Sequence, residues 1–149
     1  MYIRVIDLHD LDSLLPLFDA YRQFYRKESD LIGAKEFLHN RVENNEAIVF
    51  GAFVDDFLVG FTLLYPLFSS VRMKPIFLLN DLFVHPDARN KAIGKNLLRH
   101  AQEYAKSKNY AGVLLETEKT NDIGNHLYPA MGFQLESETN FYFWENISS

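Results

Sequence analysis

The stretch Leu78–Ala105, LLNDLFVHPDARNKAIGKNLLRHAQEYA, governs the interpretation of the whole chain. Its first seven residues are apolar except for Asn80 and Asp81, a pattern typical of a strand that is covered on both faces. A His-Pro-Asp sequence then ends the strand, because proline cannot donate to a sheet ladder. Apolar residues at helical spacing over Ile93–Ala105 predict an amphipathic helix.

The loop between this strand and this helix is basic and leads to Gly94. A strand that feeds a helix through such a loop presents unpaired backbone N–H groups at the helix N-terminus, which suits a phosphate or pyrophosphate. Many α/β proteins contain the same unit and bind nothing, so the unit alone leaves both interpretations open.

The composition indicates a globular protein. With 149 residues, 48% hydrophobic and 23% charged, the chain is most simply one domain, residues 1–149, with a proper core. The net charge of −5 argues against a general nucleic-acid binder and favours a cationic partner.

The absence of cysteine excludes disulfides, thiolate metal sites and a cysteine nucleophile. No apolar stretch reaches the roughly 20 residues that a membrane helix needs, and the N-terminus alternates apolar and charged residues, unlike a signal peptide. We therefore expect a cytoplasmic protein with no membrane partner.

The remaining patterns predict a mixed sheet with four helices, an α/β (α+β) fold of about seven strands. Gly60, inside a predicted strand, indicates a bulge or a close approach of two backbones. Residues 66–75 are predicted to be a loop. The predicted strands are 2–6, 47–53, 57–65, 76–84, 111–117, 132–136 and 141–144, and the predicted helices begin near residues 10–12, 34, 93 and 121.

Two motifs in this order resemble the GNAT superfamily of N-acetyltransferases. Arg89–Gly94, RNKAIG, is similar to the R/Q-x-x-G-x-G/A acyl-CoA loop of that family. Asn121–Phe133 is similar to its N-x-x-(A/S)-x-x-L-Y-x-x-x-G-F block. The two blocks have the family's separation, with the strand–helix–strand unit between them, and the resemblance covers the whole chain in element order.

The resemblance implies acetyl-CoA as co-substrate, with its pantetheine arm between two splayed parallel central strands. The pyrophosphate would lie on backbone N–H groups of the loop, with cationic charge beside it. The residues so implicated are Leu82, Phe83, Val84, Arg89, Asn90, Lys91, Ala92, Ile93, Gly94, Lys95 and Asn121. Ala92 replaces the first glycine of the loop pattern, and we expect it to sit in a right-handed helical first turn with somewhat weaker cofactor binding.

Tyr128 matches the family's tyrosine by register and would protonate the departing CoA thiolate. The alternative is a core aromatic on a short helix. Asn121 would cap that helix and could also hydrogen-bond the cofactor.

The amine that attacks must lose a proton, and polar residues inside the buried strand are candidates for that role. Leu79–Val84, LNDLFV, resembles the L-E-D-F-F-V strand of diamine acetyltransferases, with Asn80 in place of glutamate. Asp81, on the opposite strand face from Asn80, could bind the amine, relay its proton through water, or serve a structural bond. Glu116, at the end of the next strand, is a second catalytic candidate.

The segments Tyr21–Tyr25 and Ser29–Asp30 also resemble a microbial branch of the family that acts on basic amines, including polyamines and histone tails. Tyr25, Glu28 and Asp30 would suit a cationic acceptor, together with Asn80 and Asp81, although solvated loops carry the same residues routinely. The five histidines contain no H-x-x-x-H pair, so we expect no metal.

The sequence therefore predicts an N-acetyltransferase that acts by direct attack on a primary amine of a cationic small molecule, such as a polyamine, or of a peptide lysine. Nucleic acid is excluded as a partner, and a homodimer that pairs the C-terminal aromatics Phe141–Trp144 is included. Two alternatives stay open: a non-catalytic acyl-CoA-binding regulator on the same fold, and an interaction domain that binds no CoA.

Overall fold

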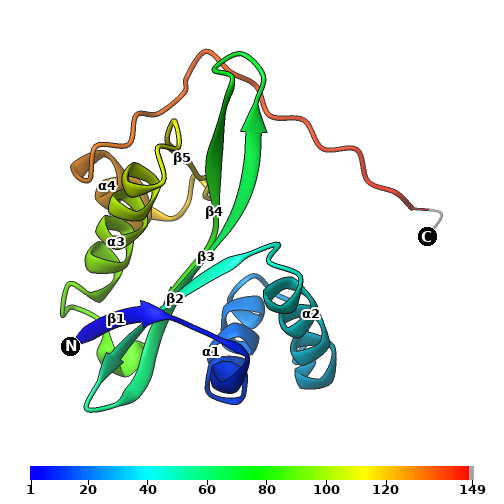
Figure 1. Ribbon diagram of the computed structural model, residues 1–149, viewed down its shortest axis with the longest axis vertical. Helices are drawn as coiled ribbons and strands as arrows, with labels where there is room; N and C mark the ends of the chain where they lie inside the picture. Colours follow the sequence, from blue (N-terminus) through cyan, green and yellow to red (C-terminus); the bar gives the residue numbers. More distant parts are fainter. Residues whose placement is uncertain (148–149) are drawn as a thin grey trace. The chain divides into compact units, whose positions relative to one another are not determined.

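The computed structural model describes residues 1–147 (Figure 1). These residues form two compact units, one from Met1 to Glu116 and one that begins at Thr117. The prediction of one domain over residues 1–149 stays a prediction.

The first unit is built on a five-stranded sheet with the order β1-β2-β3-β4-β5. The pairs β1–β2, β2–β3 and β3–β4 are antiparallel, and the pair β4–β5 is parallel. The strands are β1 (Tyr2–Val5), β2 (Ile48–Val54), β3 (Phe57–Ser69), β4 (Lys74–Val84) and β5 (Val113–Leu114).

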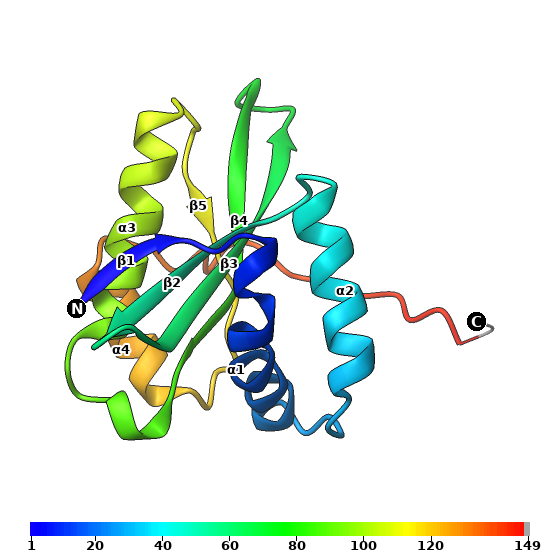
Figure 2. The same cartoon turned by 60° about the horizontal axis from the view of Figure 1, so that its bottom comes forward.

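Helices cover both faces of this sheet (Figure 2). Helices α1 (Leu11–Phe24) and α2 (Leu31–Glu43) pack together on one face, and α3 (Ile93–Ser107) packs on the other. Short 3₁₀ turns, η1 (Leu8–Asp10) and η2 (Pro86–Ala88), precede α1 and α3. The predicted helices of this unit and the predicted mixed α/β class are confirmed, since their apolar stripes face the sheet.

A bulge in β4 changes which face its side chains point to. Leu63 of β3 lies opposite Asp81, and Leu64 lies opposite Leu79, so Asn80 is an extra residue in β4. Residues 79 and 81 of a regular strand would share one face. The bulge instead turns Asp81 to the face of Leu63, which packs with α1, while Leu79 lies on the face of α3.

The pairing of β4 with β5 is short. It joins only Phe77 to Val113 and Leu78 to Leu114, and it ends immediately before the bulge. A bulge bends its strand, which favours a divergence of β4 from β5 after Leu78. The predicted splay of the parallel strands stays a prediction.

Gly60 lies beside a second bulge. Ala52 lies opposite Gly60 and Phe53 opposite Leu58, which leaves Val59 as an extra residue in β3. A Cβ atom on Gly60 would lie 3.1 Å from the backbone oxygen of Phe83. Both the predicted bulge and the predicted close approach of backbones are confirmed.

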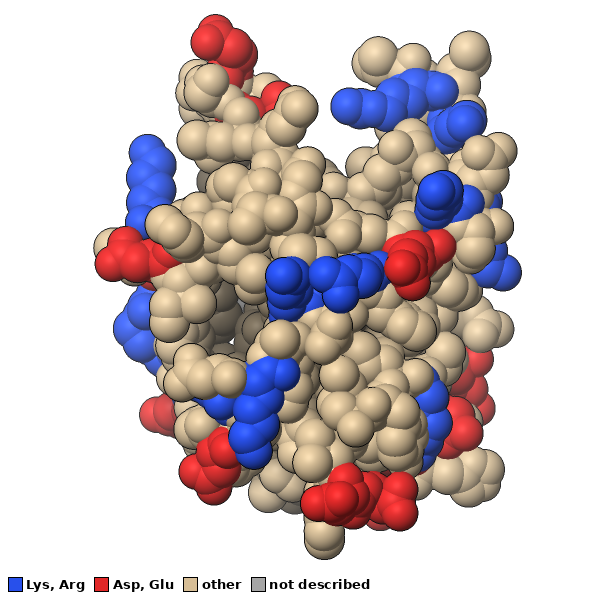
Figure 3. Space-filling view, turned by 90° about the vertical axis from the view of Figure 1, so that its left-hand side faces the viewer, with Lys and Arg blue, Asp and Glu red and all other residues tan. Residues whose placement is uncertain are grey.

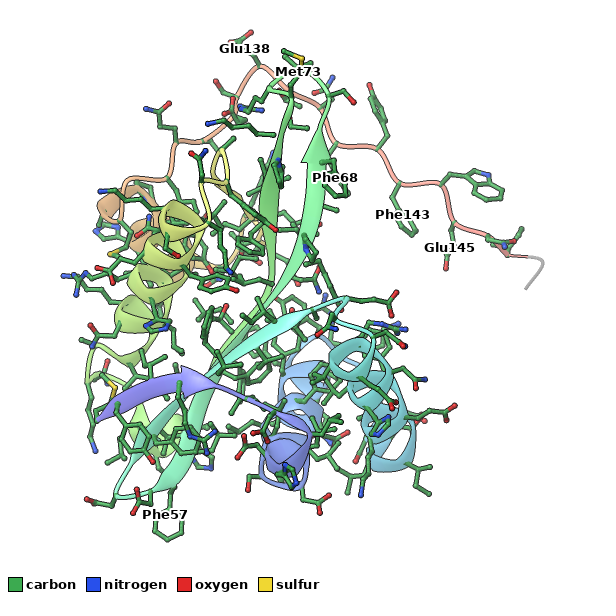
Figure 4. The ribbon with its side chains drawn as sticks, in the orientation of Figure 1. Phe57, Phe68, Met73, Glu138, Phe143 and Glu145 are labelled. Atoms are coloured by element: carbon green, nitrogen blue, oxygen red, sulfur yellow. The ribbon has the colours of Figure 1, made fainter. Side chains whose placement is uncertain are left out.

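The prediction of a loop over residues 66–75 is wrong. Strands β3 and β4 continue as a two-stranded hairpin, with Pro66 opposite Phe77 and Ser69 opposite Lys74. Pairing of β3 with β2 ends at Leu64, so Pro66 lies where β3 has an open edge and needs no second ladder partner. The tip of the hairpin carries the exposed side chains of Phe68 and Met73 (Figure 4).

The second unit contains α4 (Asp122–Ala130), which confirms the last predicted helix. Its C-terminus is closed by Gly132, with φ +91°, and by the N–H of Phe133, which donates to the Tyr128 carbonyl at 3.0 Å. The predicted strands 132–136 and 141–144 are wrong for the described chain, which is irregular from residue 133 to 147. Strand 111–117 is also shorter than predicted, and the described residues therefore form five strands where about seven were predicted.

Of the helices in residues 1–147, none combines the length and apolarity that crossing a membrane requires.

Candidate functional site

The bulge of β4 buries a carboxylate. Asp81 is only 3% exposed, and its Oδ1 accepts a hydrogen bond of 2.8 Å from the Asn80 side-chain amide. The Thr62 hydroxyl of β3 donates to the backbone oxygen of Asp81 at 2.8 Å, which ties β4 to β3 beside the bulge. Burial raises the pKa of Asp81 to about 6, although the hydrogen bonds from Asn80 and Tyr21 lower it.

The Tyr21 hydroxyl comes from α1 to the same place. It donates to the Asn80 carbonyl at 3.0 Å and lies close enough to Asp81 to influence the pKa of that carboxyl. The Tyr21 ring is held by edge contacts with Phe61 and Phe83, at centroid distances of 6.1 and 6.3 Å. A phenol fixed in this way joins α1 to the extra residue of the bulge.

Tyr65 of β3 is a further group in the electrostatic field of this carboxylate. Burial and the charge of Asp81 raise the pKa of Tyr65 to about 12, and the charge of Arg41 on α2 opposes this effect. The Tyr65 phenol therefore stays neutral, so Asp81 carries the negative charge of the cluster above its own pKa. We call Tyr21, Tyr65, Asn80 and Asp81 the bulge cluster.

The structure brings one of the three predicted acceptor residues of the α1–α2 region to this cluster. Tyr25, at the end of α1, packs its ring on Tyr21 at 5.1 Å. Asp30 is the N-cap of α2, where its carboxylate accepts from the Gly33 N–H at 2.9 Å. Glu28 is exposed in the loop before it, and its backbone oxygen accepts from Arg22 at 3.0 Å.

That loop is fixed by a buried carboxylate that the sequence analysis did not identify. Asp19 of α1 accepts from the Ser29 hydroxyl at 2.6 Å and from the Asp30 backbone N–H at 2.9 Å. These two hydrogen bonds hold the pKa of Asp19 below its ordinary value. The loop between α1 and α2 is therefore held in place by its hydrogen bonds to Asp19.

The loop before α3 has an unusual backbone. Ala92 is the N-cap of α3 and takes φ 60° and ψ 21°, so the expectation of a right-handed first turn at Ala92 is wrong. The left-handed conformation lets the chain reverse before the helix, which is why a glycine suits this position. Asn90, with φ 64°, shares this conformation.

The first turn of α3 is suited to an anion. The first helical hydrogen bond runs from the Asn96 N–H to the Ala92 carbonyl at 3.0 Å, which leaves the N–H groups of Ile93, Gly94 and Lys95 without a helical acceptor. This turn contains no acidic residue. Figure 3 looks onto the face that carries α3, where lysine and arginine side chains cross the middle of the surface.

Arg89 connects this loop to the end of β4. Its Nε donates to the Val84 carbonyl at 3.0 Å, and its guanidinium lies over the Phe83 ring at 5.6 Å. The predicted cofactor residues Leu82, Phe83 and Val84 lie on the part of β4 beyond its pairing with β5, so within residues 1–147 this part of β4 pairs with β3 alone. The first unit therefore unites an open strand edge, a basic loop and a helix N-terminus.

The remaining three predicted residues lie at the end of the first unit or in the second unit. Glu116 is exposed, just beyond β5. Asn121 caps α4, as predicted: its Oδ1 accepts from the Gly124 N–H at 3.1 Å, and its Nδ2 donates to Thr117 Oγ1 at 2.9 Å. Tyr128 lies on α4, and its ring meets the Phe133 ring at 6.0 Å, the apolar contact that accompanies this kind of helix end.

A surface groove of about 270 Å³ lies elsewhere, between β1 and α3, and contains none of the predicted site residues. Residues 1–147 contain no group of three or more His, Asp or Glu side chains that could hold a metal ion.

Sequence reasoning missed Tyr21 and Tyr65 as members of the cluster, because both fit the apolar pattern of their elements. A signal was present in their chemistry, since a tyrosine hydroxyl that is carried into a core usually needs a partner.

Comparison with known proteins gives the family. Residues 13–133 match the model of the acetyltransferase (GNAT) family. The chain is 45% identical to an uncharacterized N-acetyltransferase, YhfO, of Bacillus subtilis, over 95% of this chain and 93% of that protein. It is 29% identical to a spermidine N(1)-acetyltransferase of Thermoplasma acidophilum, over 90% of this chain and 88% of that protein.

A solved structure agrees. The crystal structure of a probable acetyltransferase superposes with a TM-score of 0.93 at 33% identity and covers 98% of both chains. The open edge of β4, the basic loop before α3 and these relatives together lead to one conclusion: the chain belongs to the acetyltransferase (GNAT) family and is an acetyltransferase.

Proposed function

We propose that this acetyltransferase moves the acetyl group of acetyl-CoA to a primary amine of a cationic acceptor by direct attack, and that Asp81 takes the proton of the amine. The observation that carries the proposal is the buried carboxylate on the bulge, at the point where β4 leaves β5. The acceptor would be a small molecule such as a polyamine, or a peptide lysine.

Asp81 has the properties of a proton acceptor. An ordinary aspartate is a weak base, but burial raises the pKa of Asp81 to about 6, so the carboxylate is more basic yet still ionised at pH 7. Asn80 holds one of its oxygens at 2.8 Å. The proton would leave the ammonium group of the acceptor, directly or through one water, before its nitrogen attacks, because an ammonium nitrogen has no free electron pair.

The residues of the loop fit acetyl-CoA. The N–H groups of Ile93, Gly94 and Lys95 would hold the pyrophosphate, with Arg89 and Lys91 adding positive charge. The backbone of Leu82–Val84 would pair with the amides of the pantetheine arm. Bound acetyl-CoA would supply the activated acetyl group and accept a proton as the C–S bond breaks.

Tyr128 would donate that proton to the departing sulfur. Its place in the family motif supports the assignment, while its contact with Phe133 shows that the ring also closes α4. Glu116 and Asn121 keep the lesser roles expected from the sequence: a second base and a contact to acetyl-CoA.

The charge of the site favours a cation. Asp81 carries the negative charge of the bulge cluster, the Tyr25 ring packs on Tyr21 next to it, and Glu28 would add a second carboxylate from the adjoining loop. The net charge of −5 supports the same class of acceptor. A relative that is named a spermidine N(1)-acetyltransferase makes polyamines the first acceptors to test.

The test measures release of the CoA thiol with polyamines, aminoglycosides and lysine peptides at pH 7 to 9. We expect turnover with at least one cationic amine. Stabilisation by acetyl-CoA with no turnover on any amine would favour a regulator, and the absence of stabilisation would favour an interaction domain.

Substitutions then test the roles. Asp81→Asn should lower turnover about 100-fold or more and leave acetyl-CoA binding unchanged, whereas Asp12→Asn, at a carboxylate with an 82% exposed side chain, should behave as the wild type. Tyr128→Phe should lower turnover as well. A Tyr128→Phe enzyme with full turnover at every pH would remove the general-acid assignment. A cytoplasmic location and a homodimer stay predictions of the sequence.

A further inference from the structure

A line of aromatic rings runs from the surface of the first unit to the bulge cluster. Phe24 is the last residue of α1 and is 58% exposed, and its ring meets the Tyr25 ring at a centroid distance of 5.2 Å. The Tyr25 ring meets the Tyr21 ring at 5.1 Å. The Tyr21 hydroxyl then lies against the bulge, close to the Asp81 carboxylate. We call Phe24, Tyr25 and Tyr21 the ring series.

The rings of the series meet edge to face. The interplanar angle is 83° between Phe24 and Tyr25 and 62° between Tyr25 and Tyr21. A contact of this kind covers at most one face of a ring, and both outer rings keep surface open to solvent, since Tyr25 is half-buried and Phe24 is exposed. Another planar ring can therefore join the series at the usual centroid separation of about 4.5–7 Å.

The surroundings of the outer rings are also apolar. Leu31 and Ile32, the first residues of α2, are 51 and 85% exposed. Together with Phe24 they bound the loop that links α1 to α2 (Figure 2). Single exposed apolar residues are normal on a protein surface, but exposed apolar residues at both ends of one loop favour an interaction site.

The charges of this loop do not favour a second ammonium group in the acceptor. Residues 22–30 contain three basic and two acidic side chains. The carboxylate of Asp30 is engaged as the cap of α2, which leaves Glu28 as the acidic side chain outside a cap. Removing a charge from water costs free energy unless the charge is paired, so an acceptor with one ammonium group at Asp81 and an uncharged remainder suits the surface best.

We propose that the preferred acceptor is a primary amine whose ammonium group is joined by a short methylene spacer to an aromatic ring, and that Tyr25 and Phe24 select it by contact with that ring. This inference rests on the proposed function and narrows its class of acceptor. The reaction is the one already described: the nitrogen loses a proton to Asp81 and bonds to the acetyl carbon, the C–S bond breaks, and the CoA sulfur is protonated. Polyamines and peptide lysines lack a ring next to Tyr25 and are poorer acceptors.

The test compares amines that differ only beyond the spacer. The value of kcat/KM is measured by release of the CoA thiol with phenylpropylamine, cyclohexylpropylamine, propylamine and spermidine. Burial of a ring should raise kcat/KM at least about 10-fold over propylamine. The phenyl compound should exceed the cyclohexyl compound, which has a similar apolar area, by roughly 2–10-fold, the effect of one aromatic contact. Spermidine should fall below phenylpropylamine.

Substitutions locate the ring contact. Phe24→Ala and Tyr25→Leu should each lower the ratio of kcat/KM for phenylpropylamine to that for propylamine by about 3-fold or more, because each removes an aromatic face. Phe57→Ala is the matched control, at a phenylalanine of β3 that is 74% exposed and lies outside the ring series (Figure 4), and it should keep the wild-type ratio. Cooperative thermal unfolding shows that each variant is folded.

A second readout does not depend on turnover. We expect nuclear Overhauser effects between the phenyl protons of bound phenylpropylamine and the ring protons of Tyr25, and none to the ring of Phe57.

The outcomes separate this inference from the proposed function. The inference alone is overturned if amines are acetylated but phenylpropylamine is no better than cyclohexylpropylamine, propylamine or spermidine. It is also overturned if the preference for the phenyl compound survives both Phe24→Ala and Tyr25→Leu. Overhauser effects to Tyr25 without turnover of any amine would overturn the proposed function and retain the ring contact, and the absence of both would overturn the two together.

Discussion

Replacing Asp81 with asparagine should stabilise the protein at neutral pH and leave it unchanged in acid. The side chain is 3% exposed and its pKa is about 6, compared with 3.8 for an unburied aspartate. A carboxyl group whose pKa is higher in the native state than in the unfolded state destabilises the native state wherever the unfolded group is ionised. Asparagine has no charge to bury and can accept the same hydrogen bond from Asn80.

The magnitude follows from the two pKa values. Below pH 3.8 both states hold the proton, and the variant gains nothing. As the pH rises from 3.8 to 6 the gain grows, and above pH 6 to 7 it levels off at about 3 kcal/mol, since each unit of pKa is worth about 1.4 kcal/mol. For a chain of this length, that corresponds to a rise in the midpoint of thermal unfolding of about 10 °C.

Scanning calorimetry of wild type and Asp81→Asn at pH 4, 5, 6, 7 and 8 measures this difference. The difference should grow with pH, while Asp12→Asn shows no such growth. The reasoning would be refuted if the difference in stability between Asp81→Asn and the wild type were the same at every pH. It would also be refuted if this difference were smaller at pH 8 than at pH 4. Together with the expected loss of turnover, a confirmed gain would mean that the protein gives up stability to keep this carboxylate.

Three other substitutions test the remaining parts of the site. Tyr21→Phe removes a hydrogen bond that lowers the pKa of Asp81, so the acid limb of the pH–rate profile should move to higher pH, and NMR titration of the Asp81 carboxyl carbon should show the same shift. Ala92→Gly relieves a left-handed backbone and should raise stability by up to about 1 kcal/mol and tighten acetyl-CoA binding, measured by denaturant unfolding and calorimetric titration; an unchanged affinity would separate the loop backbone from the cofactor. Asp19→Ala removes the hydrogen bonds from Ser29 and the next residue and should reduce the free energy of unfolding by about 2–3 kcal/mol, whereas a loss under 0.5 kcal/mol would mean that the loop holds itself.

Much of this architecture follows from the sequence, because amphipathic periodicity and turn residues act locally. The helices, the succession of strands β1 to β5 along the chain and the position of the loop before α3 were predicted in this way. The extended hairpin was not, because Pro66 reads as a strand breaker until one knows that β3 has an open edge there. The backbone of Ala92 was also mispredicted, since alanine usually indicates a right-handed turn.

The candidate site was predictable in its residue types but not in its arrangement. Asp81 attracts attention as a carboxylate in an apolar run, and its family register supports that choice. Asp81 lies near Tyr21 and Tyr65 because α1 packs on one face of the sheet, and a local sequence pattern cannot predict that packing. Residues 141–144 have a strand pattern in the sequence but form no strand in the structure, because a strand requires a neighbouring strand that a local pattern cannot supply.

The bulge has a consequence for how the protein can change. The bulge arises because β4 contains one residue, Asn80, more than β3 can pair. A substitution at this position therefore cannot restore a regular ladder. Deletion of its single codon would do so: strict alternation would still direct Leu79 toward α3 and Asp81 toward α1. Such a deletion would keep every buried side chain on its own face while straightening β4 toward β5. The loss of three nucleotides would thus change the direction of β4 relative to β5 and leave the buried side chains of β4 on their present faces.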